Sequence, residues 1–123
     1  MNDWHVLVVE DDPDGQEVVE RILRYHRIDA HLASDGESAV EQLTQNVYTL
    51  VIIDLALPNM NGWELLKFIK SQPTLAATPC IAVTAFHSAE VAVKALQAGF
   101  SAYFPKPLDA TSFVRELENV MGG

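Results

Sequence analysis

The sequence predicts a single α/β domain in which five strands of a parallel sheet alternate with five helices. Apolar runs of strand length recur five times, and the segments between them carry apolar residues at helical spacing. The first, third and fourth runs are almost continuously apolar, which is typical of parallel strands covered by helices on both faces. The five expected strands are His5 to Val9, Ala30 to Ala33, Leu50 to Ile53, Ile81 to Val83, and Ala102 to Phe104.

One expected helix follows each strand, and apolar residues three or four positions apart mark its inner face. These positions are Val18, Val19, Ile22 and Leu23; Ala39, Val40 and Leu43; Leu65, Leu66 and Ile69; Val91, Ala95 and Leu96; and Phe113, Val114, Leu117 and Val120. Four residues of N-capping type precede helices, namely Asp35, Asn61, Ser88 and Asp109. Asn46 and Gly99 suit helix ends, because both residue types tolerate the left-handed conformation that closes a helix.

The size and composition of the chain fit one globular domain over residues 1–123. A chain of 123 residues is long enough for one core and too short for two ordinary ones. Apolar residues make up 49% and charged residues 20%, which argues against disorder. Cys80 is the one cysteine of the sequence, so no internal disulfide can form. Because it lies in an apolar run, it is expected to be a buried small hydrophobe.

The charge balance argues against nucleic acid and anionic membranes as partners. Seventeen acidic and eight basic residues give a formal net charge of −9, which repels both surfaces. No apolar segment approaches the length needed to span a membrane, and the first residues lack the features of a signal peptide. We therefore expect a cytoplasmic protein that does not bind DNA directly.

Polar residues interrupt the apolar pattern where four of the expected strands end. Glu10, Asp11 and Asp12 follow the first strand, and Asp54 follows the third. Thr84 follows the fourth strand, and Lys106 lies just beyond the fifth. Folds of this class place ligands beyond the carboxyl ends of their strands, so these side chains are expected to form one site.

The residue types at these positions indicate a magnesium-dependent phosphoryl-transfer site. Carboxylates held close together repel one another unless a cation neutralises them, and oxygen ligands favour Mg²⁺ over zinc. An aspartate such as Asp54 can attack phosphorus and form an acyl phosphate. Thr84 can donate a hydrogen bond to a phosphoryl oxygen, and Lys106 can supply a positive charge to another.

Each of these residues also has a purely structural interpretation when it is taken alone. Asp54 could cap a helix, and the acidic triplet could be a solvated turn that leads into the first helix. Thr84 could satisfy backbone groups at a strand end, and Lys106 could be an ordinary surface lysine. The combination of acid, acid, hydroxyl and ammonium at four strand ends is what favours the functional interpretation.

The chain resembles response-regulator receiver domains of two-component signalling from Val6 to about Met121. The motifs that carry the resemblance are Leu7-Val8-Val9-Glu10-Asp11-Asp12, Asp54-Leu55-Ala56-Leu57-Pro58-Asn59-Met60-Asn61-Gly62, Val83-Thr84-Ala85 and Lys106-Pro107. The resemblance implies a flavodoxin-like, doubly wound (βα)5 fold with strand order 2-1-3-4-5. It also implies a cis peptide bond between Lys106 and Pro107.

The same resemblance implies a role for each site residue. Asp54 would be the phosphoacceptor, and Asp11 a direct ligand of Mg²⁺. Glu10 would act on the metal more remotely, through a water molecule, and the backbone carbonyl of Ala56 would complete the protein's share of the metal ligands. Asp12, one position beyond the acidic pair, would cap the first helix.

Signalling in this family implies a switch and a set of partners. Thr84 and Tyr103 fall on the switch positions, although Tyr103 could also be a half-buried edge aromatic. The phosphoryl group would come from phosphohistidine on a sensor histidine kinase or a histidine phosphotransfer protein. Phosphorylation would alter the surface of the fourth helix, fifth strand and fifth helix, with Val91, Ala95, Tyr103 and Phe113 as candidate residues.

Two apolar residues occupy positions where many receivers carry polar groups. Ala56 lies two residues after Asp54, and Phe86 lies two residues after Thr84. Neither side chain can orient an attacking water, so we predict a comparatively long-lived phospho-Asp54. Phe86 could equally contact a partner.

The expected function is a signalling switch rather than an enzyme, and two other classes of function fit the sequence less well. A haloacid-dehalogenase-type hydrolase commonly has a second aspartate where this chain has Ala56. A flavodoxin-type carrier would need a phosphate loop after the first strand, where Glu10, Asp11 and Asp12 would repel a flavin phosphate. Within the signalling class, the missing linker after Val120 favours a free-standing receiver over a fragment of a larger regulator.

Overall fold

The computed structural model describes residues 3–122, so residues 1, 2 and 123 of the predicted domain lie outside the described part. The strands are β1 (His5–Val9), β2 (Asp29–Ala33), β3 (Leu50–Asp54), β4 (Cys80–Thr84) and β5 (Ala102–Pro105). The helices are α1 (Pro13–Tyr25), α2 (Gly36–Gln45), α3 (Gly62–Ser71), α4 (Ala89–Ala98) and α5 (Ala110–Val120). All five strands are parallel and form one sheet in the order β2-β1-β3-β4-β5, as predicted.

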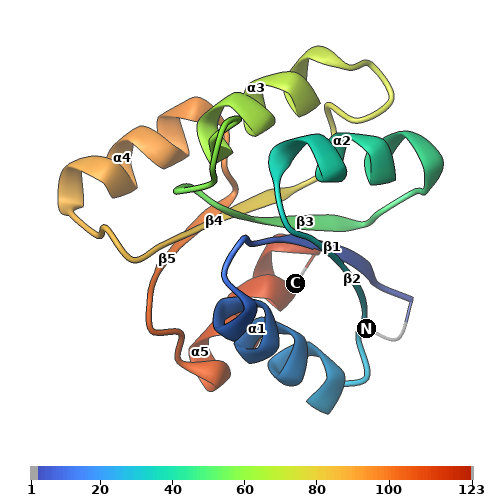
Figure 1. The fold of residues 1–123 in the computed structure, drawn as a ribbon. Helices are drawn as coiled ribbons and strands as arrows, with labels where there is room; N and C mark the ends of the chain where they lie inside the picture. Colours follow the sequence, from blue (N-terminus) through green and yellow to red (C-terminus); the bar gives the residue numbers. More distant parts are fainter. Residues whose placement is uncertain (1–2, 123) are drawn as a thin grey trace.

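The sheet lies between two layers of helices (Figure 1). Helices α2, α3 and α4 cover one face, and α1 and α5 cover the other. Successive side chains of a strand point to opposite faces, so each strand contributes to both cores. In β1, Leu7 and Val9 belong to the core under α2, α3 and α4, whereas Val6 and Val8 belong to the core under α1 and α5.

The helices begin where the sequence predicts that they begin. Asp12 accepts a hydrogen bond from the Asp14 backbone, and Asn61 forms a reciprocal capping box with Glu64. The remaining predicted caps also accept hydrogen bonds from first-turn backbone groups; they are Asp35, Ser88 and Asp109. Gly99 closes α4 with φ +117°, as expected. The left-handed conformation expected at Asn46 is wrong, because this residue ends α2 in extended backbone at φ −134° and leads directly towards β3.

Some apolar positions of the helical pattern are more exposed than predicted. Val18 is 44% exposed and Leu96 is 54% exposed. In α1 the buried residues are Val19 and Leu23, which lie four positions apart on one face of the helix. Val18 lies beside that face. In α4 only Ala95 is fully buried, so the sheet covers a narrower strip of this helix than its apolar pattern suggests.

Two further predictions concern burial. Cys80 is fully buried in β4, and burial raises the pKa of its thiol to about 12, as expected for a small hydrophobe in a core. Within residues 3–122, no helix combines the length and the apolar character that crossing a membrane requires.

Candidate functional site

The carboxyl ends of four strands lie side by side and bring together the residues selected from the sequence. Asp54 and Thr84 are the last residues of β3 and β4, and Glu10 and Lys106 directly follow β1 and β5. Backbone hydrogen bonds continue the sheet at this edge, from Leu55 N–H to the Val83 carbonyl and from Lys106 N–H to the Thr84 carbonyl, at 3.0 and 2.9 Å. The strand ends are therefore fixed relative to one another.

The ammonium group of Lys106 lies between two buried carboxylates. Its Nζ atom is 2.5 Å from Glu10 Oε1 and 3.2 Å from Asp54 Oδ2. Glu10 is 3% exposed and Asp54 is 6% exposed, so the two carboxylates depend on this ammonium for compensation within the protein. The interpretation of Lys106 as an ordinary surface lysine is therefore wrong. Its bond to Pro107 is cis, as predicted.

Asp54 does not cap a helix, because the cap of α3 is Asn61. Oδ1 of Asp54 accepts a hydrogen bond from the Ala56 backbone N–H at 3.0 Å, which fixes the side chain at the end of β3. The chain then turns tightly into α3: Gly62 N–H donates to the Leu55 carbonyl at 3.1 Å. A Cβ atom on Gly62 would lie 2.6 Å from the Asp54 carbonyl oxygen, so this approach requires glycine.

Glu10, Asp11 and Asp54 form an acidic cluster at this edge. One carboxylate oxygen from each lies within 4.8 Å of the others, with Glu10 and Asp54 buried and Asp11 exposed. Three oxygen donors of this kind suit a hard divalent cation such as Mg²⁺. The exposed position of Asp11 fits the direct ligand role expected for it, and Glu10 is already engaged by Lys106.

The pKa values of two of these groups are perturbed by their surroundings. Burial, the hydrogen bond with Asp54 and the charge of Asp54 raise the pKa of Glu10 to about 7, although the hydrogen bond with Lys106 opposes this change. Partial burial lowers the pKa of Lys106, but the hydrogen bond to Glu10 and the charges of Asp54 and Glu10 outweigh it, and the net pKa is raised. Lys106 is therefore a cation at neutral pH.

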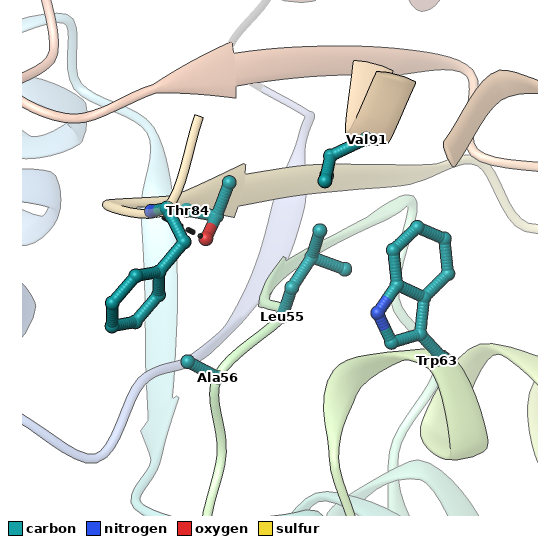
Figure 2. Close-up of a pocket in the computed structure, with 6 residues that line it drawn as sticks. Leu55, Ala56, Trp63, Thr84 and Val91 are labelled. Atoms are coloured by element: carbon teal, nitrogen blue, oxygen red, sulfur yellow. Dashed lines mark hydrogen bonds between the residues drawn. The ribbon is translucent and has the colours of Figure 1, made fainter. Parts of the chain in front are cut away.

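Thr84 lies at the wall of a surface pocket of about 200 Å³, whose lining residues are drawn in Figure 2. Its side chain is buried, and Oγ1 accepts a hydrogen bond from the Phe86 backbone N–H at 3.1 Å. The hydroxyl thus does satisfy a backbone group, and it can still donate its own hydrogen. The pocket is lined by Leu55, Ala56, Trp63, Thr84, Phe86 and Val91.

The two apolar positions next to the acidic cluster are both exposed. Ala56 contributes to the pocket wall, and the Phe86 side chain is 74% exposed. A side chain so exposed covers little beneath it, so Phe86 does not shield the site from water. Its exposure leaves a partner contact as the better-supported alternative.

Tyr103, the predicted switch aromatic, is half-buried on β5 and packs against the core under α2, α3 and α4. Its hydroxyl is hydrogen-bonded to Nδ1 of His87 at 2.9 Å. His87 was not selected from the sequence, because a single histidine in a loop carries no motif. Only the path of the chain between β4 and α4 places it against β5.

Among the other candidates for a switching surface, Phe113 and Ala95 are fully buried and serve as core residues. The large apolar residues that α4 exposes are Val93 and Leu96, at 53% and 54%. The sequence pattern missed Val93, because it lies off the face that carries the regular apolar spacing.

Comparison with known families agrees with this geometry. The model of the response regulator receiver domain family matches residues 6–118, which include every site residue named above. The chain belongs to this family. It is 35% identical over 116 residues to the transcriptional regulatory protein ZraR of Escherichia coli, covering 94% of this chain and 26% of that protein. The chain thus spans about a quarter of the length of that regulator.

Solved receiver structures share the fold over nearly the whole chain. The receiver domain of the Francisella response regulator 1452 is 27% identical, with a TM-score of 0.89 and 97% of each chain covered. The receiver domain of the sensor histidine kinase PA1611 from Pseudomonas aeruginosa is 31% identical, with a TM-score of 0.89 and 98% of each chain covered. That structure has a magnesium ion coordinated in its active-site cleft.

Proposed function

We propose that this receiver domain accepts a phosphoryl group on Asp54 from phosphohistidine, with Mg²⁺ bound, and passes the signal to a partner protein. The observation that carries the proposal is the position of Asp54. It lies at the end of β3 within the acidic cluster, 3.2 Å from the Lys106 ammonium and with Thr84 beside it. These are the groups that a carboxylate nucleophile needs for phosphoryl transfer.

The transfer requires one bond to form and one to break. An Asp54 carboxylate oxygen forms the new bond to phosphorus while the bond between phosphorus and the imidazole nitrogen of the donor breaks, and the imidazole leaves with that electron pair. Lys106 is positioned to donate to a phosphoryl oxygen, and Thr84 can donate its hydroxyl hydrogen to another. The chain supplies no general base because none is needed.

The acidic cluster would hold the metal. Glu10, Asp11, Asp54 and the backbone carbonyl of Ala56 are the proposed ligands, with Glu10 acting through water. Bound Mg²⁺ would neutralise the carboxylates and the incoming phosphoryl oxygens. The protein would then catalyse only its own phosphorylation and a slow loss of that group, so it is a switch rather than an enzyme that turns over substrate.

The donor would be a sensor histidine kinase or a histidine phosphotransfer protein, as part of a two-component system or phosphorelay. The relationship to the receiver domain of a sensor histidine kinase supports a phosphohistidine donor. Such signalling operates in the cytoplasm, where we expect this chain to act. The net charge of −9 gives no support to direct binding of nucleic acid or membrane.

The output surface would be formed by α4, β5 and α5. A phosphoryl group on Asp54 would draw the Thr84 hydroxyl towards it, and Thr84 is joined to β5 through the hydrogen bond from Lys106 N–H. Tyr103 lies on β5, and Val93 and Leu96 expose apolar area on α4. A change at Thr84 can therefore alter a surface that suits a protein partner.

The decisive test is phosphorylation with Mg²⁺ and acetyl phosphate, followed by measurement of the intact mass. Wild type is expected to gain one phosphoryl group, and Asp54→Ala none. Asp3→Ala, which removes an exposed aspartate outside the site, is expected to behave as wild type. Omitting Mg²⁺ is expected to abolish the gain. A wild type that gains no mass, or an Asp54→Ala variant that still gains it, would overturn the proposal.

A further inference from the structure

A second cluster of metal-ligand side chains lies at the opposite edge of the sheet, where the strands begin. His5 is the first residue of β1, Asp29 is the first residue of β2, and His31 is the third residue of β2. One ligand atom from each of the three lies within 4.8 Å of the others. His5 pairs with Asp29 in the parallel register and Leu7 pairs with His31, so all three side chains project from the same face of the sheet.

Hydrogen bonds around His31 fix which of its ring nitrogens is free. The Leu32 carbonyl can only accept, so the Gln42 side chain that bonds to it at 2.8 Å presents its Nε2 there and its Oε1 to Tyr48. The Tyr48 hydroxyl therefore donates to Gln42, and its oxygen accepts from His31 Nδ1 at 2.8 Å. His31 consequently carries its hydrogen on Nδ1, and the lone pair of neutral His31 is on Nε2.

His5 is held in a similar way. Its Nδ1 atom is 2.6 Å from Asp29 Oδ2, so Nδ1 donates a hydrogen bond to this carboxylate, and the two groups lie next to each other on the same side of the ring. The ring stacks on Tyr48 with a centroid distance of 4.7 Å and meets the His31 ring edge-on at 4.5 Å. The His5 backbone is tied to Thr49 at 2.9 Å. Metal-binding histidines are commonly oriented by a partner on their other nitrogen, as Tyr48 orients His31.

We propose that His5, His31 and Asp29 form a binding site for Zn²⁺ that is separate from the magnesium site. Two imidazole nitrogens and one carboxylate oxygen suit Zn²⁺ and do not suit Mg²⁺, which prefers oxygen ligands alone. The ion would take the place of the hydrogen between His5 Nδ1 and Asp29, which is released to solvent, and His31 would contribute Nε2. The Asp29 side chain is 68% exposed, which leaves the ion a path from solvent and room for a water ligand.

The site joins the first two strands at the edge away from Asp54. Its ligands come from β1 and β2, whose residues are separated by the whole of α1. An ion held by both strands binds the folded state and not the unfolded chain, so it is expected to raise the melting temperature. The same ion is not expected to take part in phosphorylation, because Asp54 lies at the other end of the sheet.

The test is isothermal titration of untagged, metal-free protein with ZnCl₂ in an excess of Mg²⁺, which occupies the acidic cluster. Wild type is expected to bind one equivalent. His31→Gln and His5→Gln are each expected to weaken binding by at least about 10-fold, and Tyr48→Phe by a smaller factor, because it removes only the acceptor for His31 Nδ1. His26→Gln, which changes a histidine outside the cluster, is expected to bind as wild type. Circular dichroism checks that each variant is folded.

Two further experiments test whether zinc binds at the proposed histidines and not elsewhere on the protein. Asp11→Ala removes a ligand of the acidic cluster and is expected to keep the zinc equivalent. In NMR spectra, Zn²⁺ is expected to shift the imidazole resonances of His5 and His31 and to leave those of His26 and His87 in place. The proposal is overturned if wild type binds no zinc in excess Mg²⁺, if His31→Gln binds as tightly as wild type, or if Asp11→Ala abolishes binding.

Discussion

The hydroxyl of Tyr103 and Nδ1 of His87 are 2.9 Å apart, which ties the proposed switch residue of β5 to the loop between β4 and α4. The two rings also lie close, with centroids 5.6 Å apart. This loop begins directly after Thr84. A movement of Thr84 towards a phosphoryl group would therefore be transmitted to Tyr103 by the loop as well as by the sheet.

Removing this hydrogen bond is expected to loosen Tyr103. In His87→Ala, the Tyr103 side chain is expected to populate more than one χ1 rotamer, because the hydroxyl loses its partner while the ring remains half-buried. Side-chain coupling constants from NMR measure the rotamer populations. His26→Ala is the matched control and is expected to leave them unchanged. Identical populations in His87→Ala and wild type would show that the hydrogen bond does not restrain the ring.

Replacing the phosphoacceptor is expected to stabilise the metal-free protein. Asp54→Asn removes one of two buried carboxylates that share Lys106, while the closer pair between Lys106 and Glu10 at 2.5 Å remains. We expect a gain of about 1–2 kcal/mol in the free energy of unfolding in EDTA. Urea denaturation provides the measurement. Mg²⁺ is expected to stabilise wild type more than the variant, and a destabilised Asp54→Asn in EDTA would contradict this account of the site.

The residue two positions after Asp54 is expected to influence how long phosphorylation lasts. Ala56 is exposed at the wall of the pocket and offers no polar side-chain atom. In Ala56→Asn, an amide at this position can orient a water molecule, so loss of the phosphoryl group is expected to be roughly 10-fold faster. Intact mass measured against time after removal of the phosphodonor gives the rate of phosphoryl loss for wild type and for Ala56→Asn.

The control for this substitution is Ala77→Asn, which places the same amide on an exposed alanine in the loop before β4. Its phosphoryl lifetime is expected to equal that of wild type. If Ala56→Asn loses the phosphoryl group no faster than Ala77→Asn, the apolar character of Ala56 does not explain slow loss.

The first residue of α3 is expected to tolerate no side chain. In Gly62→Ala, the new Cβ would lie 2.6 Å from the Asp54 carbonyl oxygen and 2.7 Å from Leu55 Cα, and neither backbone atom can yield easily. We expect a loss of about 2 kcal/mol in stability and slower phosphorylation, because the end of β3 has to shift.

Gly36 provides a matched control, since it is the first residue of α2. In Gly36→Ala, the new Cβ would meet only the Met60 side chain at 2.9 Å, which is flexible. This variant is expected to lose less stability and to be phosphorylated at the wild-type rate. If Gly62→Ala and Gly36→Ala lose the same free energy of unfolding in urea denaturation, the close approach of Gly62 to the Asp54 carbonyl does not matter for stability.

Most of the fold could be predicted because its signals are local. Alternating apolar segments and capping residues such as Asn61 act over a few positions, and the order of strands followed from the family resemblance. The site could be predicted because parallel strands end at one edge, which brings Asp54 and Lys106 together whatever the details of packing.

The features that escaped prediction depend on register and loop path. His5 meets His31 because β1 and β2 pair in one particular register, and a shift of one residue would place the rings on opposite faces. His87 reaches Tyr103 through the course of a loop that no motif specifies. The exposure of Phe86 likewise depends on how that loop leaves β4, so its side-chain position could not be inferred from its spacing to Thr84.

The thiol of Cys80 is expected to be unreactive in the folded protein. Cys80 is fully buried in β4, and burial raises the pKa of its thiol from 9.0 to about 12. At neutral pH a thiol reagent can therefore reach it only when the protein opens, and labelling is expected to be at least about 100-fold slower than for an exposed thiol. The comparison is an Ala77→Cys variant in a Cys80→Ala background, which carries its thiol on an exposed loop position.

The same pKa shift predicts the direction of a pH effect on stability. Between pH 9 and about 12 the unfolded chain loses the thiol proton while the folded protein retains it, so the contribution of Cys80 to stability falls as the pH rises through this range. Cys80→Ala removes this contribution, so its free energy of unfolding is expected to fall less steeply with pH than that of wild type. Urea denaturation at pH 8 and pH 10, on either side of the ordinary thiol pKa of 9.0, measures how the free energy of unfolding changes with pH in wild type and in Cys80→Ala. Equal slopes, or rapid labelling of Cys80 at neutral pH, would show that the thiol is accessible to water in the folded state.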